Sequence, residues 1–219
     1  MSERAKPPFR ADHVGSFLRP EALLVSRSKW IRGEIDLATL RHHEDRCIKE
    51  VVKLQEDVGM TAVTDGEFRR ESFHVDFISK VEGVDAPWDF EDAVEQHQRN
   101  KVAEEKKAAP FVPQVVDKMR LPAGGIEVDN YKYTASLTDH MVKVTVPSPT
   151  MTHFRGGRAA ISETAYPDLD GFFADLAKVY QDELALLYEA GCRYVQYDDT
   201  NLAYLCDEKM RENARQLGE

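Results

Sequence analysis

A chain of 219 residues and 24.9 kDa is long enough for one sizeable domain with a real core. Its 29 Lys and Arg against 39 Asp and Glu give a net charge of −10, which argues against a nucleic-acid partner. No long apolar run occurs, which excludes a membrane-spanning segment. The N-terminus lacks the apolar core of a secretory signal and the three cysteines show no CxxC spacing, so we expect a cytoplasmic protein with reduced thiols.

The N-terminal part of the chain predicts a strand followed by a helix. Residues 8–18 form a short apolar stretch that stops at Gly15 and Ser16, which indicates a strand that runs into a tight loop. Apolar residues three or four apart predict a helix over 36–58, with Asp36 as its N-cap.

A second strand is predicted over 60–68, and it ends in the acidic segment Asp-Gly-Glu at 65–67. The order strand, helix, strand is typical of a parallel βαβ unit. Residues 71–140 break this rhythm, because much of the segment is polar and poor in branched aliphatic residues. We interpret it as an inserted arm or lid between strands two and three, with a hairpin around Gly124 and Gly125.

The alternation of strands and helices resumes after the insertion. Valines alternate with polar residues over 141–150 before two prolines end this third strand. An apolar stripe predicts a long helix over 168–190, and residues 192–199 indicate a fourth strand that ends in two carboxylates. A last helix is predicted over 201–217, so the sequence favours an α/β fold of four βα units.

Each predicted strand ends in a polar cluster, and the carboxyl ends of parallel strands share one edge of a sheet. The clusters are Gly15-Ser16, Asp65-Gly66-Glu67, Ser148 to Thr150, and Asp198-Asp199-Thr200. Backbone N–H groups around Gly15 can hold a carboxylate, while Glu67 and Asp198 can accept hydrogen bonds from an ammonium group. These clusters therefore predict a pocket for a small amino acid. For Asp199, a structural role in a loop is an equal alternative.

Three segments carry a resemblance to a known family: FRADHVGSFLRP, TDGEFRRESF and VQYDDTNLAYLCD. They resemble the cobalamin-independent methionine synthase family, in particular its short, single-barrel bacterial members, and match its N-terminal half only. The resemblance implies a partial (β/α)8 TIM barrel of about the first four βα units over residues 1–219, with an insertion at 71–140. It also implies a methyltransferase that moves a methyl group from 5-methyltetrahydrofolate to the thiol of homocysteine, with zinc and without cobalamin.

The resemblance also suggests which residues bind substrate. It places the homocysteine carboxylate and amino group on Gly15, Ser16, Glu67 and Asp198. Five further residues are expected to line the pocket, namely His13, Asp65, His153, Phe154 and Asp199, with Phe154 nearest to the family's aromatic residue for the folate ring. This chain has Asp199 where better-studied members carry a glutamate, which leaves the role of that carboxylate open.

The family's zinc ligands are absent from this sequence. They include a His-x-Cys pair on a later strand of the barrel, and no such pair occurs here. We therefore expect no metal ligands in this chain, and we assign no catalytic residue. Without zinc the substrate thiol stays mostly neutral and is a poor nucleophile, so we expect no appreciable methyl transfer by this chain alone. A makeshift site of His13, His153 and Cys206 is the alternative.

Half a barrel leaves unpaired strand edges that need cover. We expect either a truncation of a longer enzyme, a homo-oligomer in which the edges of two copies meet, or a partner half-barrel. A non-catalytic amino-acid-binding or assembly subunit is the alternative function. A metal-free decarboxylase resembling uroporphyrinogen decarboxylase is a further possibility, and it needs several arginines at the strand ends.

Overall fold

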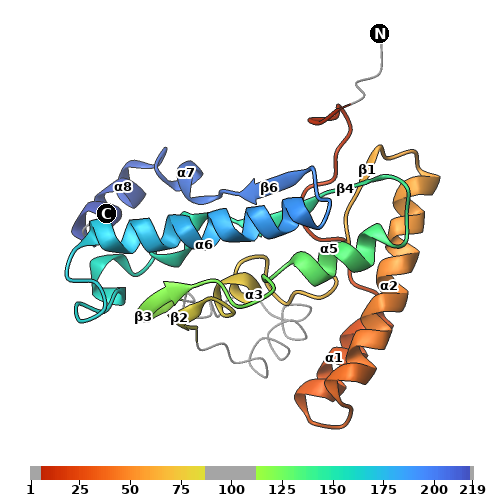
Figure 1. The fold of residues 1–219 in the computed structure, drawn as a ribbon, viewed down its shortest axis with the longest axis horizontal. Helices are drawn as coiled ribbons and strands as arrows, with labels where there is room; N and C mark the ends of the chain where they lie inside the picture. Colours follow the sequence, from red (N-terminus) through yellow and green to blue (C-terminus); the bar gives the residue numbers. More distant parts are fainter. Residues whose placement is uncertain (1–5, 87–111, 218–219) are drawn as a thin grey trace.

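The computed structural model describes residues 6–86 and 112–217 (Figure 1). The longer helices are α1 (Glu21–Ile31), α2 (Leu37–Asp57), α5 (Val128–Ala135), α6 (Leu169–Glu189) and α8 (Glu208–Gln216). The short helical segments are α3 (Val75–Ile78), α7 (Asn201–Tyr204), and the 3-10 turns η1 (Pro149–Thr152) and η2 (Gly157–Ala160). The strands are β1 (Ala62–Val63), β2 (Glu82–Asp85), β3 (Gln114–Arg120), β4 (Met141–Val142), β5 (Val144–Pro147) and β6 (Val195–Asp198).

The central strands run parallel. β1 pairs with β4, and β5 pairs with β6 so that Thr145 lies opposite Gln196 and Pro147 lies opposite Asp198. Only Lys143 separates β4 from β5, so the two form one strand that bridges β1 and β6. The parallel order of the second, third and fourth predicted strands is confirmed. Among the described residues these strands form an open array and no closed barrel.

The predicted first strand is wrong as a hydrogen-bonded strand. No strand is assigned within 8–18, although this segment does lie beside the array. One backbone hydrogen bond, from Phe17 N–H to Gly66 O at 3.2 Å, joins its end to the loop after β1. Earlier in the same segment, the carboxylate of Asp12 contacts the ammonium of Lys143. A side-chain anchor takes the place of the backbone ladder that a strand requires.

The insertion contains an antiparallel pair, but not where the sequence suggested it. β2 pairs with β3, and residues 87–111 between them lie outside the described residues. The predicted hairpin around Gly124 and Gly125 is wrong, because that turn leads into α5. The cause is Glu183 on α6, whose carboxylate accepts hydrogen bonds from the N–H groups that follow Gly125, at 2.8 Å each, and steers the chain into a helix.

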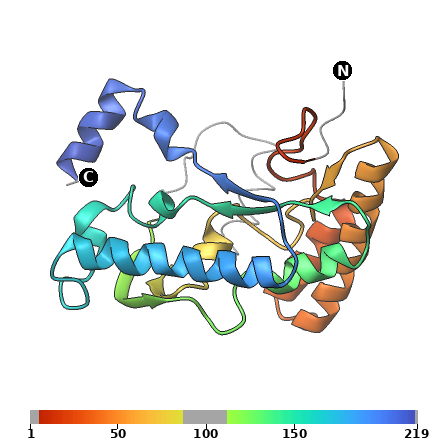
Figure 2. The same ribbon diagram turned by 45° about the horizontal axis from the view of Figure 1, so that its top comes forward.

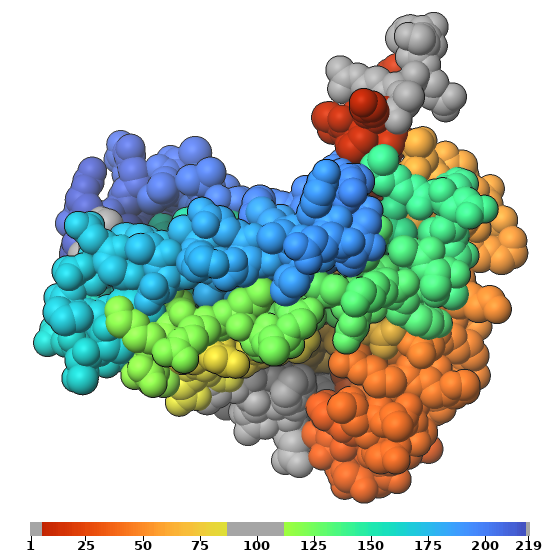
Figure 3. Space-filling model, in the orientation of Figure 1, coloured from red at the N-terminus to blue at the C-terminus, as the bar shows by residue number. Residues whose placement is uncertain are grey.

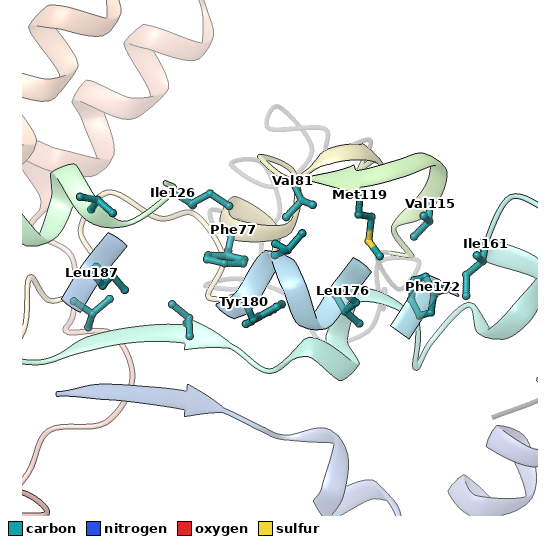
Figure 4. Close-up of a cluster of buried hydrophobic side chains, with 14 of the residues drawn as sticks. Phe77, Val81, Val115, Met119, Ile126, Ile161, Phe172, Leu176, Tyr180 and Leu187 are labelled. Carbon is teal, nitrogen blue, oxygen red and sulfur yellow. The ribbon is translucent and has the colours of Figure 1, made fainter. Parts of the chain in front are cut away.

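The long helix α6 organises the main core. Its apolar side chains pack between the insertion and the parallel strands (Figure 4). Core members labelled there include Phe77, Val81, Val115, Met119, Ile126, Phe172, Leu176, Tyr180 and Leu187. A second cluster joins α1, α2 and β1. The α1–α2 helical pair projects at one end of the molecule, and α7 and α8 lie at the other (Figures 1 and 2); the filled surface shows the same projection (Figure 3).

Side-chain caps mark where the helices begin. Asp36 accepts a hydrogen bond from Thr39 N–H at 2.8 Å and starts α2, as predicted. The predicted helix over 201–217 is divided into α7 and α8. Asp207 accepts a hydrogen bond from Met210 N–H at 2.9 Å, and this cap starts a new helix after a break.

Candidate functional site

The two faces of β5 and β6 differ in character. Val144, Val146 and Val195 pack into the core around α6. Because side chains alternate along a strand, Thr145 and Asp198 belong to the opposite face, which is polar. Of the predicted site residues, Asp198 belongs to this polar face, and Glu67 contacts it through Thr145.

Glu67 reaches this polar face from the loop after β1. It follows β1 with a φ of 57°, an uncommon value for a residue other than glycine, and its side chain is buried. Asp65 Oδ1 accepts the Glu67 N–H at 2.9 Å, and Thr145 Oγ1 donates to Glu67 Oε1 at 3.4 Å. Burial raises the pKa of the Glu67 carboxyl; Arg70 opposes this shift, and the carboxylate of Asp198 adds to it. Glu67 and Asp198 are therefore electrostatic neighbours.

Gly15 and Ser16 meet the same loop from the N-terminal segment. The hydrogen bond between Phe17 N–H and Gly66 O sets them next to Glu67 in the fold. Gly15 has a φ of 82°, which favours glycine. Gly15, Ser16, Glu67 and Asp198 are called the cradle below.

Asp198 reaches the cradle from the end of β6. Its Oδ1 accepts a hydrogen bond from Gln196 Nε2 at 2.6 Å, and Gln196 Oε1 accepts one from Lys143 Nζ at 2.8 Å. This chain of contacts fixes the Asp198 carboxylate relative to the buried ammonium.

Arg70 is a site residue to which the sequence analysis assigned no role in the amino-acid pocket. Its buried guanidinium donates to Thr145 Oγ1 at 3.1 Å and pairs with Glu127 at 3.4 Å. Burial favours the neutral form, but the carboxylates of Glu127, Asp65 and Glu67 outweigh it and raise the pKa of Arg70. Arg70 thus carries a permanent positive charge beneath the cradle. The sequence alone does not indicate that this arginine belongs to the site, because its partners Thr145 and Glu127 come from distant segments.

Two of the further pocket candidates have other contacts. His13 stacks on Phe17 with ring centroids 3.8 Å apart, and burial lowers its pKa. Asp199 is exposed, and its carboxylate accepts a hydrogen bond from Leu202 N–H at 3.4 Å at the start of α7. This contact matches the structural alternative for Asp199.

The candidates in the loop after β5 pack among aromatic rings. His153 is buried with its ring edge-on to Phe172 and Phe173, at centroid distances of 5.6 and 5.2 Å. Phe154 stacks with Tyr204 at 6.1 Å. These contacts place His153 against α6 and Phe154 against α7.

The described residues do not fit a zinc site. Within 6–86 and 112–217, no group of three or more His, Cys, Asp or Glu side chains is arranged to hold a metal ion. The alternative site of His13, His153 and Cys206 is therefore not assembled. All three cysteines are free thiols: Cys47 and Cys192 are buried, and Cys206 is exposed.

Sequence comparisons identify similar proteins. The family model described as "Cobalamin-independent synthase, Catalytic domain" matches residues 9–219. The chain is 36% identical over 217 residues to the uncharacterized protein YxjH of Bacillus subtilis. This match covers 99% of this chain and 54% of YxjH. It is 28% identical over 199 residues to the 5-methyltetrahydropteroyltriglutamate–homocysteine methyltransferase of Thermosynechococcus vestitus, covering 90% of this chain and 24% of that protein.

Solved structures support the same fold. One similar structure is the crystal structure of a protein from Listeria monocytogenes that is described as a proposed vitamin-B12-independent methionine synthase. It matches with a TM-score of 0.73 and 32% sequence identity, and the match covers 96% of this chain and 59% of that chain. A B12-independent methionine synthase from Shewanella sp. W3-18-1 in complex with selenomethionine matches with a TM-score of 0.54 and 20% identity, over 74% and 43% of the two chains, which shows the fold alone. The chain spans about half the length of the curated relatives it matches, at 54% and 52% for the first two.

No helix among the described residues has the length and apolarity to cross a membrane.

Proposed function

Because the chain belongs to the family of cobalamin-independent synthase catalytic domains, we propose that it supplies the amino-acid-binding part of a methyltransferase site. The proposed acceptor is the thiol of homocysteine or a similar amino acid, and the proposed methyl donor is 5-methyltetrahydrofolate. The name of the Thermosynechococcus relative supports this choice of reaction.

The observation that carries the proposal is the pairing of Glu67 and Asp198 beside the Gly15–Ser16 backbone. We assign the ligand's ammonium group to the two carboxylates, which are strong charged acceptors. Its carboxylate is assigned to the N–H groups around Gly15 and the hydroxyl of Ser16. The buried Arg70 offsets the negative charge at this site and opposes the rise in the pKa of the Glu67 carboxyl.

Zinc supplies thiolate activation in the family, and the described residues provide no site for it. No methyl-transfer step is therefore derived from these residues. We propose that this chain alone binds the amino acid without appreciable turnover. Measuring methylation of homocysteine with added zinc tests this, and turnover near that of a full-length relative contradicts it.

Calorimetric titration tests the cradle directly. We expect wild-type protein to bind L-homocysteine, and to bind 4-mercaptobutanoate, which lacks the amino group, about tenfold more weakly. Glu67→Gln and Asp198→Asn should each weaken L-homocysteine binding about tenfold. Asp199→Asn is the matched control, because it removes the same charge at the adjacent, exposed position. Equal affinity for the two ligands, or no binding at all, refutes the proposal.

The open edge of β6 supports a second candidate, an assembly subunit that acts with another polypeptide or a second copy. In the described part of the chain, β6 pairs only with β5. Tyr197 and Leu202 nearby are 42% and 60% exposed. Light scattering after size exclusion tests this candidate: a dimer or a stable complex with a second half-barrel supports it, and a soluble monomer contradicts it.

A further inference from the structure

Two arginines hold the backbone of the loop that carries Glu67. Arg27, on α1, donates from Nη2 to Phe68 O at 2.7 Å and from Nη1 to Arg70 O at 3.0 Å. Arg19, just before α1, donates from Nη2 to Arg70 O at 2.7 Å and to Glu67 O at 3.5 Å. Three carbonyl groups of one short loop are therefore held by side chains from a different part of the chain.

Arg27 is itself fixed by acidic partners. Its side chain is 5% exposed and pairs with Glu71 at 2.9 Å and with Glu44 at 3.7 Å. Glu44 belongs to α2 and is also held by Arg41 at 2.8 Å and by Arg69 at 3.3 Å. The loop after β1 is thus tied to the α1–α2 pair through a network of charged groups, in which each buried charge has a partner.

This attachment matters because Glu67 has a costly backbone conformation. A left-handed φ of 57° in a residue other than glycine costs on the order of 1 kcal/mol or more, and it persists only where the surroundings enforce it. Asp65 holds the Glu67 N–H, and the arginines hold the carbonyls on the other side. The arginines therefore oppose rotation of the peptide groups after Glu67.

Arg19 also connects the two sides of the cradle. It stands three residues after Ser16 in the chain, and its guanidinium ends on the carbonyls of Glu67 and Arg70. Together with the hydrogen bond from Phe17 N–H to Gly66 O, this sets the Gly15–Ser16 backbone against the Glu67 loop.

We infer that Arg19 and Arg27 are positioning residues of the cradle, which hold Glu67 where it selects ligands that carry an amino group. This inference rests on the proposed function, since it assigns Glu67 to the ammonium group. It predicts that the arginines affect selectivity between ligands and local order of the loop more than they affect the fold.

Arg27→Lys tests the inference, because it keeps the positive charge beside Glu44 and Glu71. A single ammonium cannot reproduce the fixed fork that reaches Phe68 O and Arg70 O together. Arg41→Gln is the matched control, because Arg41 also binds Glu44, and no hydrogen bond or ion pair joins it to residues 67–71 within the described part of the chain. The first measurement is hydrogen exchange of peptides over 66–71, which is independent of any ligand. The second is the ratio of affinities for L-homocysteine and 4-mercaptobutanoate.

We expect Arg27→Lys and Arg19→Lys to speed exchange in 66–71 about tenfold, with exchange in α6 unchanged, and to reduce the affinity ratio about tenfold. Arg41→Gln should change neither. Unchanged exchange in the loop overturns the inference, as does equal weakening of both ligands. If wild-type protein binds neither ligand, the proposed function fails, and so does the assignment of selectivity; the exchange data then decide whether the arginines order the loop.

Discussion

Lys143 Nζ lies 2.9 Å from Asp12 Oδ1, and this ion pair joins the N-terminal segment to the start of β5. The Lys143 side chain is 0% exposed. It also donates to His13 O and, at 2.8 Å, to Gln196 Oε1. One ammonium group thus links the N-terminal segment, β5 and β6, and it does so without a backbone ladder along 8–18.

Replacing Lys143 with methionine should therefore destabilise the whole array. Lys143→Met keeps most of the side-chain volume but removes the donor to Asp12 Oδ1, the His13 carbonyl and Gln196 Oε1. Only Tyr194 then still donates to the Asp12 carboxylate among these groups, so we expect a loss of about 3 kcal/mol in the free energy of unfolding. Urea denaturation measures it. The control is Lys178→Met, which removes an exposed i,i+4 pair with Asp182 and should cost less than about 0.5 kcal/mol. Equal effects of the two substitutions would contradict the anchoring role.

Local rules predicted the parts of the fold that depend on neighbours in sequence. Asp36 was recognisable as an N-cap because the cap and the N–H it satisfies are three residues apart. The position of Glu67 and Asp198 after β1 and at the end of β6 followed from strand periodicity and parallel order. These rules need no knowledge of which distant segments touch.

The rest depends on contacts that leave no pattern in the sequence. Helix α1 was missed because its buried face holds Leu23, Ser26 and Arg27, which do not form an apolar stripe. Arg27 and Arg19 bind backbone carbonyls, which every residue has, so no residue type identifies their partners. The turn before α5 was misread for a similar reason, since a carboxylate on α6, far along the chain, decides its direction.

A glycine inside the insertion is a sensitive point for stability. Gly83 has a φ of 84°, and a Cβ there would lie 2.5 Å from Lys118 O on the paired strand. Both the conformation and the clash oppose a side chain, so we expect Gly83→Ala to cost about 3 kcal/mol of unfolding free energy. Gly124→Ala is the control, because Gly124 has a φ of 91° with nothing within 4 Å, and should cost about 1 kcal/mol. Thermal and urea unfolding compare the two, and similar losses would rule out the clash.

Acid should weaken the fold through His74. Burial and, secondarily, the charge of Arg155 lower its pKa from 6.5 to about 4. Between these values the unfolded chain binds a proton that the folded chain does not, so stability falls as pH falls from about 6.5 to about 4. His74→Gln should flatten this dependence by up to about 1 kcal/mol per pH unit, after allowance for solvent screening. Unfolding free energies across this range give the slope; parallel wild-type and variant curves would exclude His74 as its source.

Glu67 should set the pH dependence of ligand binding. Burial, with Asp198 and Asp65 adding to it and Arg70 opposing it, raises the pKa of Glu67 above its ordinary value of 4.5. A protonated Glu67 cannot pair with an ammonium group, whereas the ammonium itself stays charged in acid. The affinity for L-homocysteine should therefore fall as pH decreases through this raised pKa, by up to about tenfold per pH unit below it.

Titrations with L-homocysteine from about pH 7 downward check this, with 4-mercaptobutanoate as the ligand that does not need the carboxylate. Glu67→Gln should bind weakly with a shallower pH dependence, because a glutamine side chain does not titrate. If the wild-type affinity stays constant down to about pH 4.5, Glu67 is not the ammonium acceptor.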